Sequence, residues 1–387
     1  MTSPTLSRRA HLQQLALGAG LSASGLLPAR LALAAQADHT SSEQRLVVVL
    51  LRGALDGLSA VPAMGDPAWA SLRGGAETPS ALPLDSTFGM HPGLAHLHHW
   101  YLNKELAVVH AVASSYRERS HFDAQQQLES GGDRPFVLST GWLARALQAT
   151  QHSAVAMAPA MPLALRGADR ATTWTPSRRP SKSQDTLDRI AAMYADDVPL
   201  ASALAQAMEQ QDKSMGTEAS TGAGFSALAK QAGAFLSAPR GPRIAWLEVG
   251  GWDTHSQQTA RLGRLLPALD DALNVLRESL SVRWATTTVL VMTEFGRSAA
   301  WNGSQGTDHG TASIAFVAGG QVAGGQVFTD WPGLGRHQLL DGRDLRPTRD
   351  IRSLIMPIVQ RQFQLATGAM NAVLPGATSP LEHLWRI

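Results

Sequence analysis

Short apolar runs recur along this chain, and stretches with helical spacing lie between them. Each run is nearly continuous in hydrophobicity and ends at glycine or polar residues, as strands do when both of their faces are buried. Such strands are typical of a mostly parallel sheet that is covered by helices. The five runs are Arg45 to Leu51, Leu106 to Val112, Arg243 to Val249, Thr286 to Met292 and Ser313 to Val317.

The clearest helix is predicted between the third and fourth runs, over residues 256–280. Leucines recur there at helical spacing, and Pro267 predicts a kink. A strand, a turn, a long helix and another strand form a βαβ unit, so this part of the chain predicts an α/β fold.

The middle of the chain has a different composition. A polar stretch is followed by two helical patterns, Thr186 to Tyr194 and Leu200 to Gln211, and then by residues 214–224, which are rich in glycine, serine and threonine. This segment lacks a core-sized set of apolar residues. It predicts a helical insertion or cap, at about 166–240, on a single domain of residues 38–387. A solvent-exposed connector is the alternative.

The N-terminus predicts a removable signal. Ser7-Arg8-Arg9-Ala10-His11-Leu12 precedes a weakly apolar stretch, and the small residues Ala35-Gln36-Ala37 follow it. This arrangement resembles a twin-arginine export signal, although His11 stands where that signal usually has a bulky apolar residue. The resemblance implies recognition by the twin-arginine translocase, removal of residues 1–37 and a periplasmic or secreted protein. A membrane anchor that stays attached is the alternative, and Arg30 disfavours it.

Composition narrows the classes of function. The chain has 387 residues, 44% of them hydrophobic and 17% charged, and no apolar run of transmembrane length follows the N-terminus. Its 33 basic residues face 31 acidic ones, and removing the three arginines of the signal leaves 30 against 31. We therefore expect a protein that does not span a membrane and does not bind nucleic acid. Without cysteine, a metal must be held by oxygen and nitrogen ligands.

Polar residues stand next to each predicted strand. The third run ends in the segment Glu248-Val249-Gly250-Gly251-Trp252-Asp253-Thr254-His255, where two carboxylates and an imidazole flank a predicted sharp turn. Ligands gather at the carboxyl ends of strands in open parallel sheets, so these clusters predict a site for hard divalent cations. A polar loop is the alternative for any one cluster. The other clusters hold Asp56, residues 114–123, Glu294 with Arg297, and Asp308 with His309.

Ser120 stands where a helix is expected to begin. Backbone N–H groups and the helix dipole favour an anionic substrate there and, beside a metal, a serine alkoxide nucleophile. The structural alternative is a plain N-cap, which is the usual role of a serine before a helix.

The order of these residues is similar to that of the alkaline phosphatase-like metallohydrolases, which include phosphatases and sulfatases. The resemblance implies a three-layer α/β/α sandwich, Ser120 as nucleophile and two divalent ions, whether zinc, manganese, magnesium or calcium. The ligands implied are Asp56, Glu248, Asp253, His255, Glu294, Asp308 and His309. The last part departs most from the pattern, because Glu294 and Phe295 stand where the family has an aspartate and a histidine. In another alignment, Asp308-His309-Gly310 is itself the aspartate and histidine signature.

Over nearly the whole chain, the sequence more closely resembles an uncharacterised exported family, domain of unknown function 1501. The motifs that carry this resemblance are Leu51 to Leu58, Gly89 to Pro92, Arg119 to Gln125, Gly250 to His255, Thr293 to Arg297 and Gly306 to Gly310. Ala54 and Leu55 depart from the family's usual residues. No Cys or Ser-x-Pro-x-Arg stands where a formylglycine nucleophile would, which disfavours true sulfatase chemistry.

Two functions follow. The first is an exported metal-dependent hydrolase of a phosphate or related ester, whose substrate is a small molecule or a surface polymer. His91, Arg119, His121, Asp123 and Arg297 are then the candidate substrate-binding residues. The second is a non-catalytic exported protein with a degenerate site that binds a ligand or a partner in assembly. The resemblance implies a candidate partner, because relatives are often encoded beside another exported family.

Overall fold

A mixed sheet flanked by helices organises the described part of the chain. The computed structural model describes residues 44–74, 81–176, 193–194, 197, 200–202, 224–377 and 379–386. A nine-stranded sheet has the order β10-β4-β9-β8-β1-β7-β5-β6, with β11 also paired to β4. Its strands are β1 (Arg45–Leu51), β4 (Leu106–Ala113), β5 (Ala154–Ala156), β6 (Ala171–Thr173), β7 (Ile244–Val249), β8 (Thr287–Thr293), β9 (Ser313–Ala318), β10 (Gln326–Phe328) and β11 (Arg349–Asp350).

The central strands end together. β1 pairs in parallel with β7 and β8, and Leu51 lies opposite both Val249 and Thr293. The residues that follow these three strands therefore leave the sheet at one edge, as predicted for parallel strands.

β9 is the exception to the parallel arrangement. It runs antiparallel to β4 and β8, and its first residue, Ser313, lies opposite Val112 near the end of β4. The residues before β9 consequently reach the same edge as the residues after β1, β7 and β8. The predicted mostly parallel α/β sheet is confirmed, with this one strand reversed.

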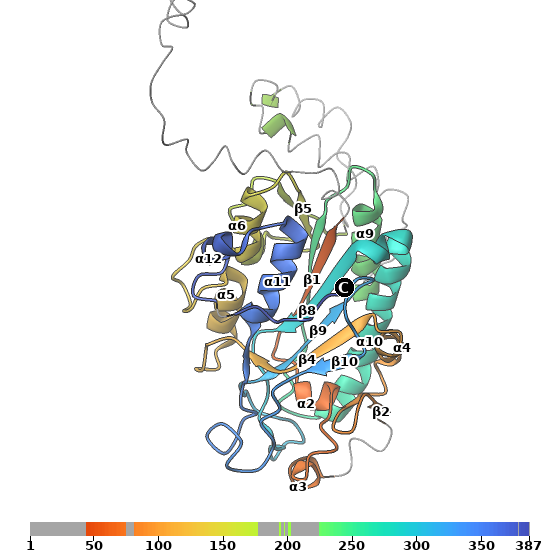
Figure 1. Ribbon diagram of the computed structural model, residues 1–387, viewed down its shortest axis with the longest axis vertical. Coiled ribbons are helices and arrows are strands. Elements are labelled where there is room, and N and C mark those ends of the chain that lie inside the picture. The colour runs from red at the N-terminus through yellow and green to blue at the C-terminus, as the bar shows by residue number, and fades with distance from the viewer. Residues whose placement is uncertain are drawn as a thin grey trace, which may run out of the picture. The chain divides into compact units, whose positions relative to one another are not determined.

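Alternate residues of β1 pack into two separate cores, because successive side chains of a strand point to opposite faces. Val47 and Val49 belong to one core, and Leu46 and Val48 to the other. The first core includes residues of α4 (Ala95–Leu102), α9 (Phe225–Ser237) and α10 (Gln258–Leu280), and the second includes residues of α5 (His121–Ser130), α6 (Trp142–Gln148), α11 (Ile351–Phe363) and α12 (Met370–Val373). These two helical layers enclose the sheet (Figure 1).

The remaining elements are short. They are α2 (Gly57–Ala60), α3 (Trp69–Arg73), β2 (Leu82–Pro83), β3 (Gly89–Met90), η2 (Leu163–Leu165), η3 (Ser281–Thr286) and η4 (Thr367–Ala369). β2 and β3 form a separate two-stranded sheet. Within the described ranges, no helix is both long and apolar enough to cross a membrane.

Both ends of the segment predicted as an insertion are part of the sheet domain. β6 is an edge strand of the main sheet, and α9 packs against α10 and contributes Phe235 to the core. Most of the segment between them lies outside the described residues, including the two predicted helical patterns apart from a few positions. The predicted signal peptide also lies outside them.

Candidate metal centre

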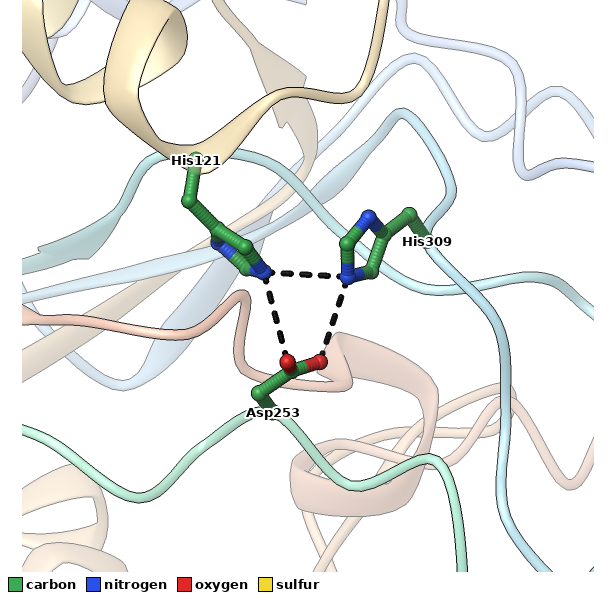
Figure 2. Close-up of side chains that lie close together, drawn as sticks. All are labelled: His121, Asp253 and His309. Carbon is green, nitrogen blue, oxygen red and sulfur yellow. Dashed lines mark hydrogen bonds and ion pairs between the residues drawn. The ribbon is translucent and has the colours of Figure 1, made fainter.

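Three side chains from distant parts of the chain meet at the edge where the central strands end. His121 is the first residue of α5, Asp253 lies on the loop after β7, and His309 lies on the segment before β9 (Figure 2). Their ligand atoms all lie within 4.8 Å of one another. The two Nε2 atoms are 3.0 Å apart, and Asp253 lies 3.2 Å from His309 Nε2 and 3.6 Å from His121 Nε2. We call these three residues the triad.

Two glycines allow the loops around the triad to approach closely. Gly53, with a φ of +116°, adopts a backbone conformation that side chains disfavour, and a Cβ there would lie 2.6 Å from the backbone nitrogen of Asp253. A Cβ on Gly306 would lie 2.3 Å from the carbonyl carbon of His255. Gly53 and Gly306 therefore permit close packing of backbone segments at this edge.

Asp253 pairs with Arg297 but remains accessible to solvent. Its Oδ1 accepts from Arg297 Nη1 at 2.6 Å and lies 3.0 Å from His255 Nε2. Burial works to raise the pKa of Asp253, yet the hydrogen bond and charge of Arg297 hold it below its ordinary value. The side chain is 43% exposed, whereas that of Arg297 is fully buried. Asp253 is thus an ionised carboxylate that a cation can reach from solvent.

The two triad histidines differ in their surroundings. The hydrogen bond to Glu294 raises the pKa of His121. Burial, together with the charge of His121, lowers the pKa of His309. His309 Nδ1 lies 2.9 Å from the carbonyl oxygen of Arg119, so donation to this oxygen leaves Nε2 directed at the other triad atoms.

His255 and Asp308 extend the site toward solvent. The His255 ring lies between Asp253 and Asp308, with Nδ1 3.3 Å from Asp308 Oδ1. Asn302 donates to the same oxygen at 3.0 Å, and this bond is the main cause that lowers the pKa of Asp308. The side chains of His255 and Asp308 are about half exposed, at 46% and 51%. His255 thus contacts Asp253 directly and links it to Asp308.

Glu294 lies directly behind His121. Its fully buried carboxylate approaches His121 Nδ1 at 2.8 Å through Oε1. Burial tends to raise the pKa of Glu294, but the hydrogen bonds from His121 and Gln125 keep it below its ordinary value. Phe295, which stands where the superfamily pattern has a histidine, stacks on the His121 ring at a centroid distance of 4.8 Å.

The other two predicted metal ligands, Glu248 and Asp56, form ion pairs with arginines. Arg52 contacts both carboxylate oxygens of Glu248, at 2.7 and 2.8 Å, and also pairs with Glu129 at 2.8 Å. Asp56 is buried, accepts from Arg73 at 2.7 and 3.2 Å and caps α2 by accepting from Leu58 N. The structure thus groups both acids with arginines, apart from the triad.

The remaining predicted site residues have structural partners. Ser120 is the N-cap of α5, with its Oγ 3.5 Å from Asp123 N, and Asp123 accepts from the Tyr116 hydroxyl at 3.0 Å. Arg119 pairs with buried Asp344 at 2.8 Å. His91 Nδ1 accepts from Gly93 N at 3.0 Å. Of the five predicted substrate-binding residues, His121 belongs to the triad, Arg297 contacts it through its side chain, and Arg119 contacts it through its backbone carbonyl.

Sequence reasoning missed the partners of Glu248, Asp56 and Arg119. Arg52, the partner of Glu248, directly follows the first strand, so its position gave a signal, whereas Arg73 and Gln258 beside Asp56 and Asp344 beside Arg119 had none. It also missed a second group of metal-ligating type, His96 with Asp270 and Asp271. Asp270 there accepts from His96 N at 2.8 Å and Leu97 N at 2.9 Å, which makes it a cap for α4.

Comparisons with known proteins give a family and several structural likenesses. The model of the family described as Protein of unknown function (DUF1501) matches residues 117–374. A comparison with curated proteins found no match.

Solved structures with a similar fold include Ps i-CgsB in complex with k-i-k-neocarrahexaose, with a TM-score of 0.46 and 11% identity over 87% of this chain and 75% of that one. A 2-O GAG sulfatase has a TM-score of 0.42 and 11% identity over 84% and 71% of the two chains. The phosphonate monoester hydrolase of Agrobacterium radiobacter has a TM-score of 0.36 and 9% identity over 71% and 68%.

Proposed function

This chain belongs to the family of proteins of unknown function called DUF1501, and from that premise we propose that it is an exported, metal-dependent hydrolase of phosphate or related esters. The observation that carries the proposal is the triad, in which two imidazoles and a carboxylate converge from three separate elements. Convergence at the edge where the strands end is the usual place for a ligand in such sheets. The resemblance to the alkaline phosphatase-like superfamily suggests the class of reaction.

The chemistry of the donors fits a divalent cation. Each triad histidine directs Nε2 at the triad while Nδ1 faces an oxygen, and Asp253 supplies an ionised oxygen that is accessible to solvent. Two imidazoles with one carboxylate suit zinc or manganese better than magnesium or calcium. His121, Asp253 and His309 would hold the ion, and His255 is the nearest further donor. The proposal therefore needs one ion rather than the two that the sequence predicts, because arginines neutralise Asp56 and Glu248.

The protein's own residues would perform the remaining tasks. A bound divalent ion supplies Lewis-acid polarisation of an ester oxygen. Arg297 orients Asp253 and adds a fixed positive charge that favours an anionic substrate. Ser120 is the proposed nucleophile, because it precedes His121 at the start of α5, where backbone N–H groups stabilise negative charge. Its hydroxyl must give up the long hydrogen bond to Asp123 N to attack.

Location and partners remain part of the proposal. The arginine pair Arg8-Arg9 and the small residues before Asp38 support export by the twin-arginine translocase to the periplasm or beyond. An ester on a small molecule or a surface polymer is the proposed substrate in that compartment. A co-encoded exported protein is the proposed partner.

One observation favours a second function, a non-catalytic protein that binds a ligand or assembles with a partner. Two predicted ligands, Asp56 and Glu248, are neutralised by Arg73 and Arg52, and Phe295 replaces a superfamily histidine beside His121. A site reduced in this way can still bind an ion or an anion without turning over an ester.

Metal content and turnover together test the proposal. The purified mature protein should bind about one zinc or manganese ion per chain and hydrolyse a member of a panel of phosphate and sulfate esters. Asp253→Asn and His309→Ala should lose both the ion and the activity, whereas Asp271→Asn, a control in the group beside His96, should keep both.

Ser120→Ala separates the two functions. We expect it to keep the ion and to lower kcat by roughly a hundredfold or more, since it removes a covalent step. Wild-type protein that binds no ion contradicts the metal site. Protein that binds the ion but hydrolyses no ester supports the binding function instead.

A further inference from the structure

We infer that Glu294 is a positioning residue that fixes the tautomer and the direction of the His121 ring, and that it is not itself a metal ligand. The inference rests on the proposed metal site, but its structural part concerns His121 alone. It assigns Glu294 a role different from the ligand role that the sequence predicts.

The tautomer of the His121 ring follows from the groups that contact Glu294 Oε1. Glu294 Oε1 accepts from Gly53 N at 2.8 Å and from Gln125 Nε2 at 2.9 Å, and both of these groups are donors only. The same oxygen lies 2.8 Å from His121 Nδ1, so this nitrogen carries the proton and donates. The neutral ring then has its free lone pair on Nε2, which faces His309 and Asp253.

Gln125 is itself held in one orientation. Its Oε1 accepts from Arg52 Nη1, and a guanidinium can only donate. Its Nε2 must therefore face Glu294, and the amide cannot flip without placing two donors or two acceptors together. Arg52 is anchored in turn by both oxygens of Glu248 and by Glu129. A continuous chain of hydrogen bonds thus runs from Glu129 and Glu248 to the His121 ring.

Glu294 has no free route to an ion. The side chain is fully buried, and three donors converge on Oε1. The Thr293 hydroxyl lies 2.9 Å from Oε2 on the other side. A carboxylate behind a histidine ligand fixes the ring and increases its basicity, and removal of such a group typically lowers metal affinity about 10-fold to 100-fold.

The first test needs neither a metal nor a variant of Glu294. Long-range proton–nitrogen NMR of the metal-free full chain, with the His121 signals assigned by their loss in His121→Ala, reports which ring nitrogen carries the proton. We expect the neutral ring to be protonated at Nδ1. A ring protonated at Nε2 would overturn the inference.

The second test uses Glu294→Gln and cobalt, whose visible spectrum reports its ligands. We expect affinity for cobalt to fall about 10-fold to 100-fold while the band positions stay unchanged. The control is Asp66→Asn, a buried acid that accepts from Trp331 Nε1 at 2.9 Å and from Leu334 N at 3.1 Å and lies outside the hydrogen-bond chain that ends at His121; its affinity should stay within about twofold of wild type.

The possible failures can be told apart. Unchanged affinity in Glu294→Gln would overturn positioning, and altered band positions would show that Glu294 is a ligand. If Glu294→Gln does not fold, the tautomer of the wild-type ring still decides the inference. If wild type binds no cobalt, zinc or manganese, the metal proposal fails while the NMR result for His121 still stands or falls separately.

Discussion

Asp56 and Asp253 are both aspartates after strands at one edge of the sheet, and both are predicted metal ligands, yet their surroundings differ. Asp56 is 1% exposed and is held by Arg73, Ser59 and Gln258. Asp253 is 43% exposed and faces two triad imidazoles as well as Arg297. The first carboxylate is permanently neutralised inside the protein, whereas the second is open to a cation from solvent.

The difference teaches that residue type and strand position do not define a ligand. A buried carboxylate must be paired, because an isolated buried charge is very costly. Once a guanidinium supplies that pairing and burial also keeps solvent away, little remains for a metal ion. An exposed carboxylate stays hydrated and can exchange water for a metal, so its internal partners matter less for folding. Asp56 should therefore matter for stability and Asp253 for binding.

The largest expected effect is the loss of unfolding free energy when the ion pair of Asp56 is broken. Arg73→Met leaves the Asp56 carboxylate buried without its ion-pair partner, and breaking such a pair costs about 3–5 kcal/mol. Arg297→Met also removes a buried guanidinium, but the partner it leaves, Asp253, can be hydrated, so the loss should be smaller. Urea unfolding of both metal-free variants measures the difference. Equal losses would contradict the distinction between the two aspartates.

The second-largest expected effect is that the contribution of Asp56 to stability depends on pH. Burial opposes the shift, but Arg73 lowers the pKa of Asp56 below its ordinary value. Its contribution to stability is therefore complete above the unfolded pKa, about 3.9, and is lost as the pH falls below that value. Wild type and Asp56→Asn should differ most in unfolding free energy above pH 4 and converge below it. A constant difference from pH 6 to pH 2.5 would refute this role.

The smallest expected effect on stability is that of replacing Asp253. Without metal, Asp253→Asn should lower the free energy of unfolding by less than Arg73→Met does, because the asparagine Oδ1 can still accept from buried Arg297 and the half-exposed side chain can be hydrated. The same variant should lose the ion, as proposed above. Thermal unfolding without and with zinc gives both results: zinc should raise the Tm of wild type and leave that of Asp253→Asn unchanged. A large loss of stability in the metal-free variant would make Asp253 a structural residue like Asp56.

The sequence predicted the framework of the sheet well. Each of the five predicted strands has a counterpart whose ends lie within one residue of the prediction, and α10 begins two residues later than predicted. Long apolar runs carry this information, because burial on both faces demands them. β5, β6, β10 and β11 were missed because segments of two or three residues carry no periodic signal.

The candidate site was predicted in part. Asp253, His255, Asp308 and His309 were expected together from their positions next to strands, and the structure places them in contact. His121 was predicted as a substrate-binding residue, but the structure makes it a member of the triad. His309 was included in the predicted site because Asp308-His309-Gly310 adjoins a predicted strand. It precedes β9 rather than following it. Because β9 runs antiparallel to its neighbours, His309 reaches the edge where β1, β7 and β8 end.

The sequence by itself determined which segments form the sheet, which polar residues adjoin its strands, and which family the chain resembles. Those properties are local, because apolar periodicity and turn residues act over a few neighbours. The tertiary structure alone decided which carboxylates meet imidazoles and which meet arginines. Arg73 is 17 residues from Asp56, whereas Glu294 is 173 residues from His121, and no local pattern encodes such partners. Burial and charge pairing across the folded edge separate the open triad from the neutralised acids beside it.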